Sequence, residues 1–229
     1  MNYKTANSLR VTAIVFMGLT AAMNLLGGAG TVCAAFLTKK YPPMWVFMDY
    51  QWLYQPIMII TIIMGFAGVW ATVKLTRGGT TVYRDTMIIL VLGTLLAGIQ
   101  VYASLMIRGK AVPANMKLYA NAVTLILFLL LKLPRVRERV DFSRPAKKAE
   151  QAAAGGIAAF AAGIMTLSTF FWVGPSHSYM GNNWVEEYQF PILVLGSLLA
   201  AGGLTAILWA LNQMLLSSTS GELAHKSKS

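Results

Sequence analysis

The chain has 229 residues, of which 56% are hydrophobic and only 12% are charged, and its formal net charge is +11. Because a soluble domain normally has about a quarter of its residues charged, this chain has too few charges to cover a globule in water. The lysines and arginines flank apolar segments instead of forming a separate basic domain. The positive charge therefore indicates contact with lipid headgroups and excludes nucleic acid as a partner.

Six apolar segments predict six transmembrane helices. Each has about 18 to 28 residues, which suits a hydrocarbon core about 30 Å thick at about 1.5 Å per residue. In chain order they are Val11–Leu37, Leu53–Val73, Met87–Ile107, Met116–Leu133, Ala153–Val173 and Phe190–Leu216. We expect an all-α integral membrane protein with a four-helix unit at 1–133, a basic connector at 134–152 and a helical hairpin at 153–217. The Ser/Lys-rich tail at 218–229 is expected to be disordered.

The basic residues also predict the orientation of the helices. Seven of them lie from Lys132 to Lys148, and none lies from Ala149 to His225. Because cytoplasmic loops are enriched in Lys and Arg, we expect the connector and both termini in the cytoplasm, with the chain in the plasma membrane. Of the 19 Lys and Arg residues, 14 are then expected on the inner side and five in the outer loops, namely Lys39, Lys40, Arg108, Lys110 and Lys117.

Small residues at short spacings predict close helix packing. Because lipid is as apolar as leucine, membrane helices associate where small residues allow their backbones to approach. The hairpin is therefore expected to pack against itself, against the four-helix unit or against another subunit. The glycine cluster of the first span has an alternative role as a local break in a long helix. The candidate packing residues are Gly27, Gly28, Gly30, Gly155, Ala159, Gly163, Gly202 and Ala206.

The polar residues inside the predicted spans include Asn24, Gln100 and Asn121, and we expect no ionisable residue to be buried with them. Proton-coupled carriers usually place a titrating residue in the membrane, so a proton-driven mechanism is disfavoured. We expect a hydrogen bond between Gln100 and Asn121 on neighbouring helices. A polar substrate site at these residues is the alternative.

Few residues are suited to hold a cofactor. His177 and His225 are the only histidines and lie outside the spans, which excludes a b-type haem held by two helix histidines. Imidazole and carboxylate are zinc ligands, so His177, Glu186 and Glu187 form a weak metal candidate. No cofactor is predicted.

Aromatic residues gather at the two outer edges of the predicted bundle. Amphipathic rings favour the membrane–water interface, so an interfacial belt is expected, with a pocket for a lipid or quinone headgroup as the alternative. The two groups are Trp45, Tyr50, Trp52 and Tyr54, and Trp172, Tyr179, Trp184 and Tyr188.

These observations favour a non-catalytic helix-packing subunit or scaffold of a larger membrane assembly, in contact with the bilayer and with other subunits or copies of itself. A small transporter or channel for a neutral or lipid-like molecule is the second hypothesis. An enzyme with an outer-face site is the third, and it would need His177, Glu186 and Asp49 within hydrogen-bonding distance of one another.

Overall fold

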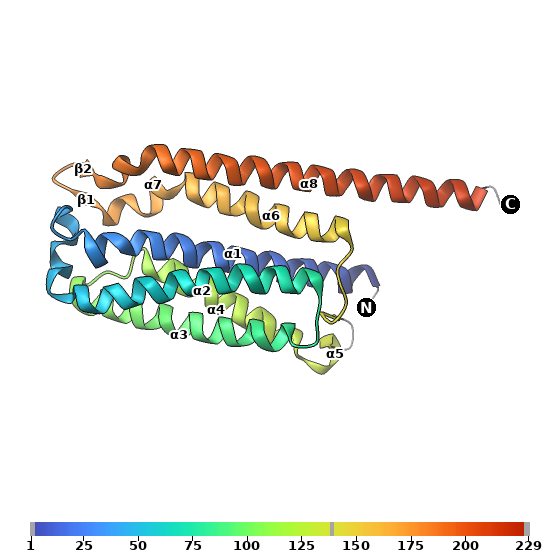
Figure 1. Cartoon of the computed structure of the whole chain (residues 1–229), viewed down its shortest axis with the longest axis horizontal. Coiled ribbons are helices and arrows are strands. Elements are labelled where there is room, and N and C mark those ends of the chain that lie inside the picture. The colour runs from blue at the N-terminus through green and yellow to red at the C-terminus, as the bar shows by residue number, and fades with distance from the viewer. Residues whose placement is uncertain (1–2, 138–139, 227–229) are drawn as a thin grey trace.

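The computed structural model describes residues 3–137 and 140–226, with side chains described over 8–136 and 140–216. It is 84% helical, and its long helices run side by side along one axis (Figure 1). These are α1 (Tyr3–Phe36), α2 (Gln51–Arg77), α3 (Val82–Arg108), α4 (Ala114–Leu131), α6 (Lys148–Leu167) and α8 (Gln189–Lys226). The short elements are η1 (Pro42–Tyr50), α5 (Pro134–Arg137), α7 (Thr169–Trp172), η2 (Gly174–Ser176), η3 (Trp184–Tyr188) and a hairpin of β1 (Ser178–Tyr179) and β2 (Asn182–Asn183).

The chain is an all-α integral membrane protein. Within the described residues, five helical segments are long and apolar enough to cross a membrane, where six had been predicted. They are Ser8–Phe36, Pro42–Arg77, Val82–Arg108, Ala114–Leu131 and Trp184–Leu216. The predicted fifth span overlaps α6, which is not one of these five segments. Helix α6 begins with polar residues, consists mostly of Ala and Gly, and ends at Leu167.

The bundle has two different ends. The loop end carries η1, the 109–113 turn and the segment from 168 to 188. The basic end carries the 78–81 turn and residues 132–137 and 140–147. At the basic end, α8 extends beyond the other helices (Figure 1). It continues to Lys226, through residues 218–226 that the sequence predicted to be disordered. Lengthening an existing helix needs no new nucleus, which favours this continuation.

The basic connector is folded against the four-helix unit. Phe142 is buried, and its ring stacks on Phe128 with centroids 6.1 Å apart. The amide of Gly79 donates to the Phe142 carbonyl at 3.1 Å, and Arg10 of α1 donates to the Leu75 carbonyl at 3.1 Å. The connector therefore closes the basic end of the bundle.

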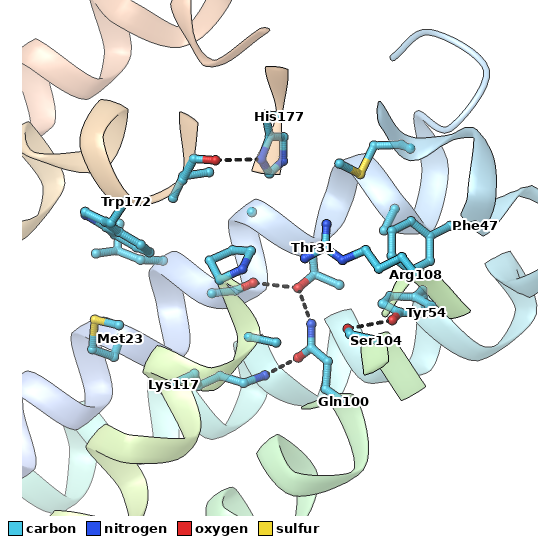
Figure 2. A pocket seen from close by; sticks show the side chains of 18 residues that line it. Met23, Thr31, Phe47, Tyr54, Gln100, Ser104, Arg108, Lys117, Trp172 and His177 are labelled. Atoms are coloured by element: carbon cyan, nitrogen blue, oxygen red, sulfur yellow. Dashed lines mark hydrogen bonds between the residues drawn. The ribbon is translucent and has the colours of Figure 1, made fainter. Parts of the chain in front are cut away.

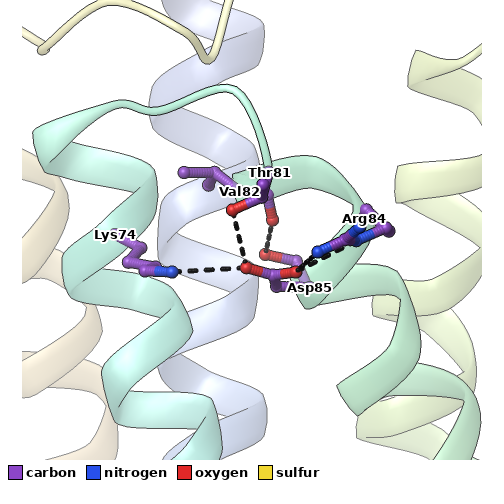
Figure 3. Close-up of polar contacts among 6 residues, drawn as sticks. Lys74, Thr81, Val82, Arg84 and Asp85 are labelled. Carbon is purple, nitrogen blue, oxygen red and sulfur yellow. Dashed lines mark hydrogen bonds and ion pairs between the residues drawn. The ribbon is translucent and has the colours of Figure 1, made fainter.

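A charged cluster fixes the turn between α2 and α3 (Figure 3). Asp85 accepts hydrogen bonds from Thr81 at 2.9 Å, from Lys74 at 3.3 Å and from Arg84 at 3.2 Å. Exposed ion pairs contribute at most about 1 kcal/mol each. The cluster orients the turn and adds little to the free energy of unfolding.

Helices α6 and α8 pack closely through glycines. A Cβ at Gly163 would lie 2.5 Å from the Ala200 nitrogen, and one at Gly156 would lie 2.8 Å from the Gly203 oxygen. Any side chain at these positions would push the two backbones apart. Gly163 thus lies where close packing was predicted, and the hairpin packs against itself.

Other predicted packing positions are shifted by one residue. A Cβ at Gly155 or Gly202 would meet no atom within 4 Å, because their neighbours Gly156 and Gly203 face the partner helix instead. Ala159 and Ala206 are half-buried. Adjacent residues differ by about 100° around a helix, so paired glycines do not reveal which of them faces the contact.

Candidate functional site

A seam of polar side chains joins α1 and α4 inside the bundle. The hydroxyls of Thr20 and Thr124 lie 2.7 Å apart. One turn further, Asn24 and Asn121 exchange amide hydrogen bonds at 3.3 and 2.9 Å. Gly93 of α3 leaves space for Asn121, whose amide oxygen a Cβ there would meet. These groups satisfy one another, as polar groups inside a membrane must.

The seam leads to Lys117, which is only 2% exposed. Its ammonium group donates to the Thr61 hydroxyl at 3.0 Å and to the Gln100 amide oxygen. The Gln100 amide nitrogen donates to Thr31 at 3.0 Å, and the Thr31 hydroxyl donates to the Gly27 carbonyl at 2.6 Å. Figure 2 shows this chain of hydrogen bonds along one side of a cavity.

The position of Lys117 overturns two expectations. It was assigned to an outer loop, and no ionisable residue was expected to be buried inside the predicted spans. Helix α4 begins at Ala114, which places Lys117 in its first turn and facing inward. Gly27 leaves space for it, since a Cβ there would lie 3.2 Å from the Lys117 Cδ.

The expected hydrogen bond between Gln100 and Asn121 does not form, because each has another partner. Gln100 contacts Lys117 and Thr31, and Asn121 contacts Asn24. The sequence held a signal for this arrangement. Lys117, Asn121 and Thr124 recur at spacings of four and three, which places all three on one face of a helix.

A small cavity of about 70 Å³ adjoins Lys117. Most of its wall is apolar, and we call it the polar cavity because its polar groups gather on one side. Tyr54 and Ser104 on its wall are hydrogen-bonded at 2.9 Å, and the Arg108 guanidinium lies 5.5 Å from the centre of the Phe47 ring. A buried water needs about 10–15 Å³ of such volume, so the cavity has room for several waters or one small polar group. Among the described residues that line it, none is acidic.

A larger apolar cavity of about 400 Å³ lies beside the polar one. The two share several lining residues: Leu26, Gly30, Trp172, Val173 and His177. We call the two together the paired cavity. The apolar part has a structural origin, because α6 lies between α1 and α8 and ends at Leu167, short of the loop end (Figure 1). Beyond that residue the chain continues as α7, and Thr169, Trp172 and Val173 form part of the cavity wall.

Aromatic residues of both predicted groups line the paired cavity. Tyr54 belongs to the polar part, Trp184 and Tyr188 belong to the apolar part, and Trp172 lines both. Tyr41 lies at the edge of the apolar part, and its ring packs edge-on against Trp184 with centroids 5.7 Å apart. The other four residues of the two predicted groups, Trp45, Tyr50, Trp52 and Tyr179, are exposed and line neither part.

Hydrogen bonds hold η3 against the segment before η1. The Glu187 carboxylate accepts from Lys40 at 2.7 Å and from the Tyr41 hydroxyl at 2.9 Å. The Tyr41 and Tyr188 hydroxyls lie 2.8 Å apart. The bond to Glu187 raises the pKa of Lys40 above its ordinary value. This latch, Lys40–Tyr41–Glu187–Tyr188, fixes the start of α8 beside the apolar cavity.

The metal candidates are dispersed in the structure. Over residues 8–136 and 140–216, no group of three or more His, Cys, Asp or Glu side chains is placed to hold a metal. Glu187 belongs to the latch, and Glu186 is exposed. Nor does a hydrogen bond join His177, Glu186 and Asp49 in the described part of the chain. These three residues do not form the hydrogen-bonded group that an outer-face enzyme was expected to need.

His177 lines both parts of the paired cavity. It is 8% exposed, and its Nδ1 lies 2.9 Å from the Ser176 hydroxyl and 3.2 Å from the Val173 carbonyl oxygen. Burial lowers the pKa of His177 below its ordinary value. At neutral pH the ring is therefore uncharged, and the charge in the paired cavity comes from Lys117 and Arg108.

The glycines predicted to pack in α1 have three different environments. Gly28 allows close approach of α2, since a Cβ there would lie 2.6 Å from the Ile62 Cγ1. Gly27 faces Lys117, as described above. Gly30 lines both cavities, and a Cβ there would meet nothing within 4 Å. Gly30 is thus part of the cavity wall and not of a helix contact.

Comparison with family models, with curated proteins and with solved structures found no match to this chain.

Proposed function

We propose that the protein binds a lipid-like amphiphile in the paired cavity. The observation that carries the proposal is the junction of a polar cavity with an apolar one inside the membrane spans. Small-molecule sites are mostly apolar, about 300–1,000 Å³ in volume, and contain a few convergent polar groups. In this arrangement, the head of the ligand lies beside Lys117 and its tail lies between α1 and α8.

The buried lysine supports a binding role over a purely structural one. A lysine costs about 2.5–3.5 kcal/mol at the centre of a membrane helix and less near its end, and Lys117 lies in the first turn of α4. Ionisable residues that face the interior of a bundle mark functional sites. Helix packing alone requires no charge, and α6 and α8 associate through glycine without one. A ligand that interacts with the ammonium group accounts for its presence.

Gly30→Leu tests the proposal directly. The new side chain enters the cavity space without meeting a backbone, and leucine favours a helix over glycine by about 0.8–1 kcal/mol. We expect the variant to fold and to lose co-purifying lipid, measured by native mass spectrometry after gentle detergent solubilisation. Gly155→Leu is the matched control, since its Cβ also meets nothing but lies away from the cavity. Equal lipid retention in both variants would refute the proposal.

The orientation completes the proposal. We place the basic end in the cytoplasm and the loop end outside, so the ligand is held in the outer half of the membrane, which we take to be the plasma membrane. Excess Lys and Arg in the connector supports this placement. In a Cys33→Ala background, a cysteine introduced at exposed Ser178 should react with an impermeant reagent from outside. One introduced at Ser143 should react only after permeabilisation, and the reverse pattern would overturn the orientation.

A second candidate function, a subunit of a larger assembly, is favoured by α8. Only 11% of its most apolar 18-residue stretch is buried within the chain, compared with 33–44% of the corresponding stretch in the other four spanning segments. Its outer face is available to another subunit as well as to lipid. Mild solubilisation followed by mass spectrometry would reveal stoichiometric partners, and recovery of a lone stable monomer would rule this function out.

A further inference from the structure

We infer that the ligand is an anionic amphiphile, whose small acidic head binds Lys117 and Arg108 while its single apolar tail occupies the adjoining cavity. This inference rests on the proposed function and names the ligand class of that same site. Two cationic side chains line the polar cavity, and none of the described residues around it is acidic. The site is therefore positively charged, and its charge is balanced only when an anion is bound.

The surroundings of Lys117 are neutral. Its two hydrogen-bond acceptors are the Thr61 hydroxyl and the Gln100 amide oxygen, neither of which carries charge. No ion pair links Lys117 to an acidic side chain within the described part of the chain. An ammonium group has three donors, so one N–H of Lys117 remains for a further acceptor.

The neighbouring groups reinforce this polarity. The Gln100 amide oxygen accepts a hydrogen bond from Lys117, and the Gln100 amide nitrogen donates one to the Thr31 hydroxyl. The Thr31 hydroxyl in turn donates to the Gly27 carbonyl. The acceptors near Lys117 are thus already occupied by protein donors. A head that itself brings acceptor oxygens fits this wall better than one that brings donors.

Arg108 supplies the second positive charge. Its guanidinium donates to the backbone carbonyls of Lys110 and Val112 and lies over the Phe47 ring. These contacts hold the group at the cavity without neutralising it, because backbone carbonyls and a ring carry no net charge. A zwitterionic head would bring a third cation close to two others, which like-charge repulsion disfavours.

Size limits the head and the tail differently. The polar cavity of about 70 Å³ suits a carboxylate or a single phosphoryl group. The apolar cavity of about 400 Å³ is lined on one side by α1 and on the other by α8, so a chain can extend from Gly30 towards Leu195. An unbranched fatty chain with a terminal acid has both properties.

Three probes with the same tail distinguish binding by the charged head from binding by the apolar tail. Oleate carries a carboxylate, oleyl phosphate carries a phosphoryl group and oleyl alcohol carries neither. Binding to the delipidated full-length protein in neutral detergent can be measured for each by native mass spectrometry. We expect oleate, oleyl phosphate or both to bind about tenfold or more tightly than oleyl alcohol, the usual gain from a charge-assisted hydrogen bond.

Two variants complete the test. Lys117→Met should remove the preference for the acids over the alcohol, measured as the ratio of their dissociation constants. Arg108→Gln should weaken the same preference independently, which keeps the test decisive if one variant does not fold. Lys39→Met, a loop-end residue that is exposed, is the matched control and should bind as the unaltered protein does.

The outcomes distinguish the inferred charge of the ligand from the proposed lipid-binding function. If the alcohol binds as tightly as both acids, and Gly30→Leu displaces all three, the inferred charge is wrong and the proposed function stands. If none of the three binds to the unaltered protein, both are refuted. A preference for oleyl phosphate over oleate identifies the head as a phosphoryl group, and the opposite order identifies it as a carboxylate.

Discussion

Replacing Lys117 by methionine should leave the ligand-free protein at least as stable as the unaltered chain. Methionine keeps the length of the side chain and removes its charge. The burial of that charge costs at most about 2.5–3.5 kcal/mol, the value for the centre of a membrane helix, because Lys117 lies in the first turn of α4. The substitution also removes the hydrogen bonds to Thr61 and Gln100. Because side-chain hydrogen bonds within membranes average about 0.6 kcal/mol and reach about 1.7, these two together contribute about 1–3 kcal/mol. The difference predicts a gain of up to about 1 kcal/mol in the free energy of unfolding.

The assay is reversible unfolding of delipidated protein in mixed micelles, followed by circular dichroism, with Lys39→Met as the control. Addition of a bound ligand should reverse the order. At a concentration of about 100 times its dissociation constant, a ligand stabilises the folded state by about 2.7 kcal/mol. Oleate should therefore raise the stability of the unaltered chain and have a smaller effect on Lys117→Met. A ligand-free variant that is less stable by about 2 kcal/mol or more would make Lys117 a structural residue and refute this reasoning.

Two further predictions concern the hairpin and the loop end. Gly163→Leu should destabilise the protein by about 1–3 kcal/mol or more, because its side chain would collide with the backbone of α8. Gly155→Leu should be neutral or stabilising, because a Cβ there meets no atom within 4 Å. Thermal unfolding in the same detergent compares the two variants, and similar losses of stability would refute the close packing of α6 and α8. His177 has a lowered pKa in the folded state, so the unfolded chain binds more protons, and stability should fall as the pH decreases through about 6.5, the unfolded value. The unfolding midpoint at pH 5.5 and 7.5 should differ less in His177→Gln, and an equal difference would assign the pH effect to other groups.

The apolar segments of the sequence predict the long helices, because hydrophobic runs of this length leave few alternatives inside a membrane. They miss the end of α6 at Leu167, since the turn at Ser168 lies within a run that stays apolar to Val173. Residues on both sides of that end, including Thr166, Thr169 and Trp172, line the apolar cavity. A hydropathy profile does not contain this information, because both the helix and the turn are apolar there.

The candidate site was only partly predictable. Asn24, Gln100 and Asn121 were identified from their polarity, and all three lie in the hydrogen-bonded interior. Lys117 was missed because it is near a helix end, where lysines usually extend towards the interface. The inward face of α4 is visible in the spacing of Lys117, Asn121 and Thr124, and a periodicity analysis of polar residues would have placed the lysine with them.

The central claim is that an amphiphile occupies the space between α1 and α8 at the loop end. A photoactivatable fatty acid with a diazirine midway along its chain tests this claim most directly, after incorporation into membranes that contain the full-length protein. We expect cross-links concentrated on residues that line the apolar cavity, such as Ala29, Trp172 and Leu195. In Gly30→Leu these cross-links should be lost. Cross-links spread evenly over the lipid-facing side chains of α2, α3 and α8, and unchanged in that variant, would contradict it.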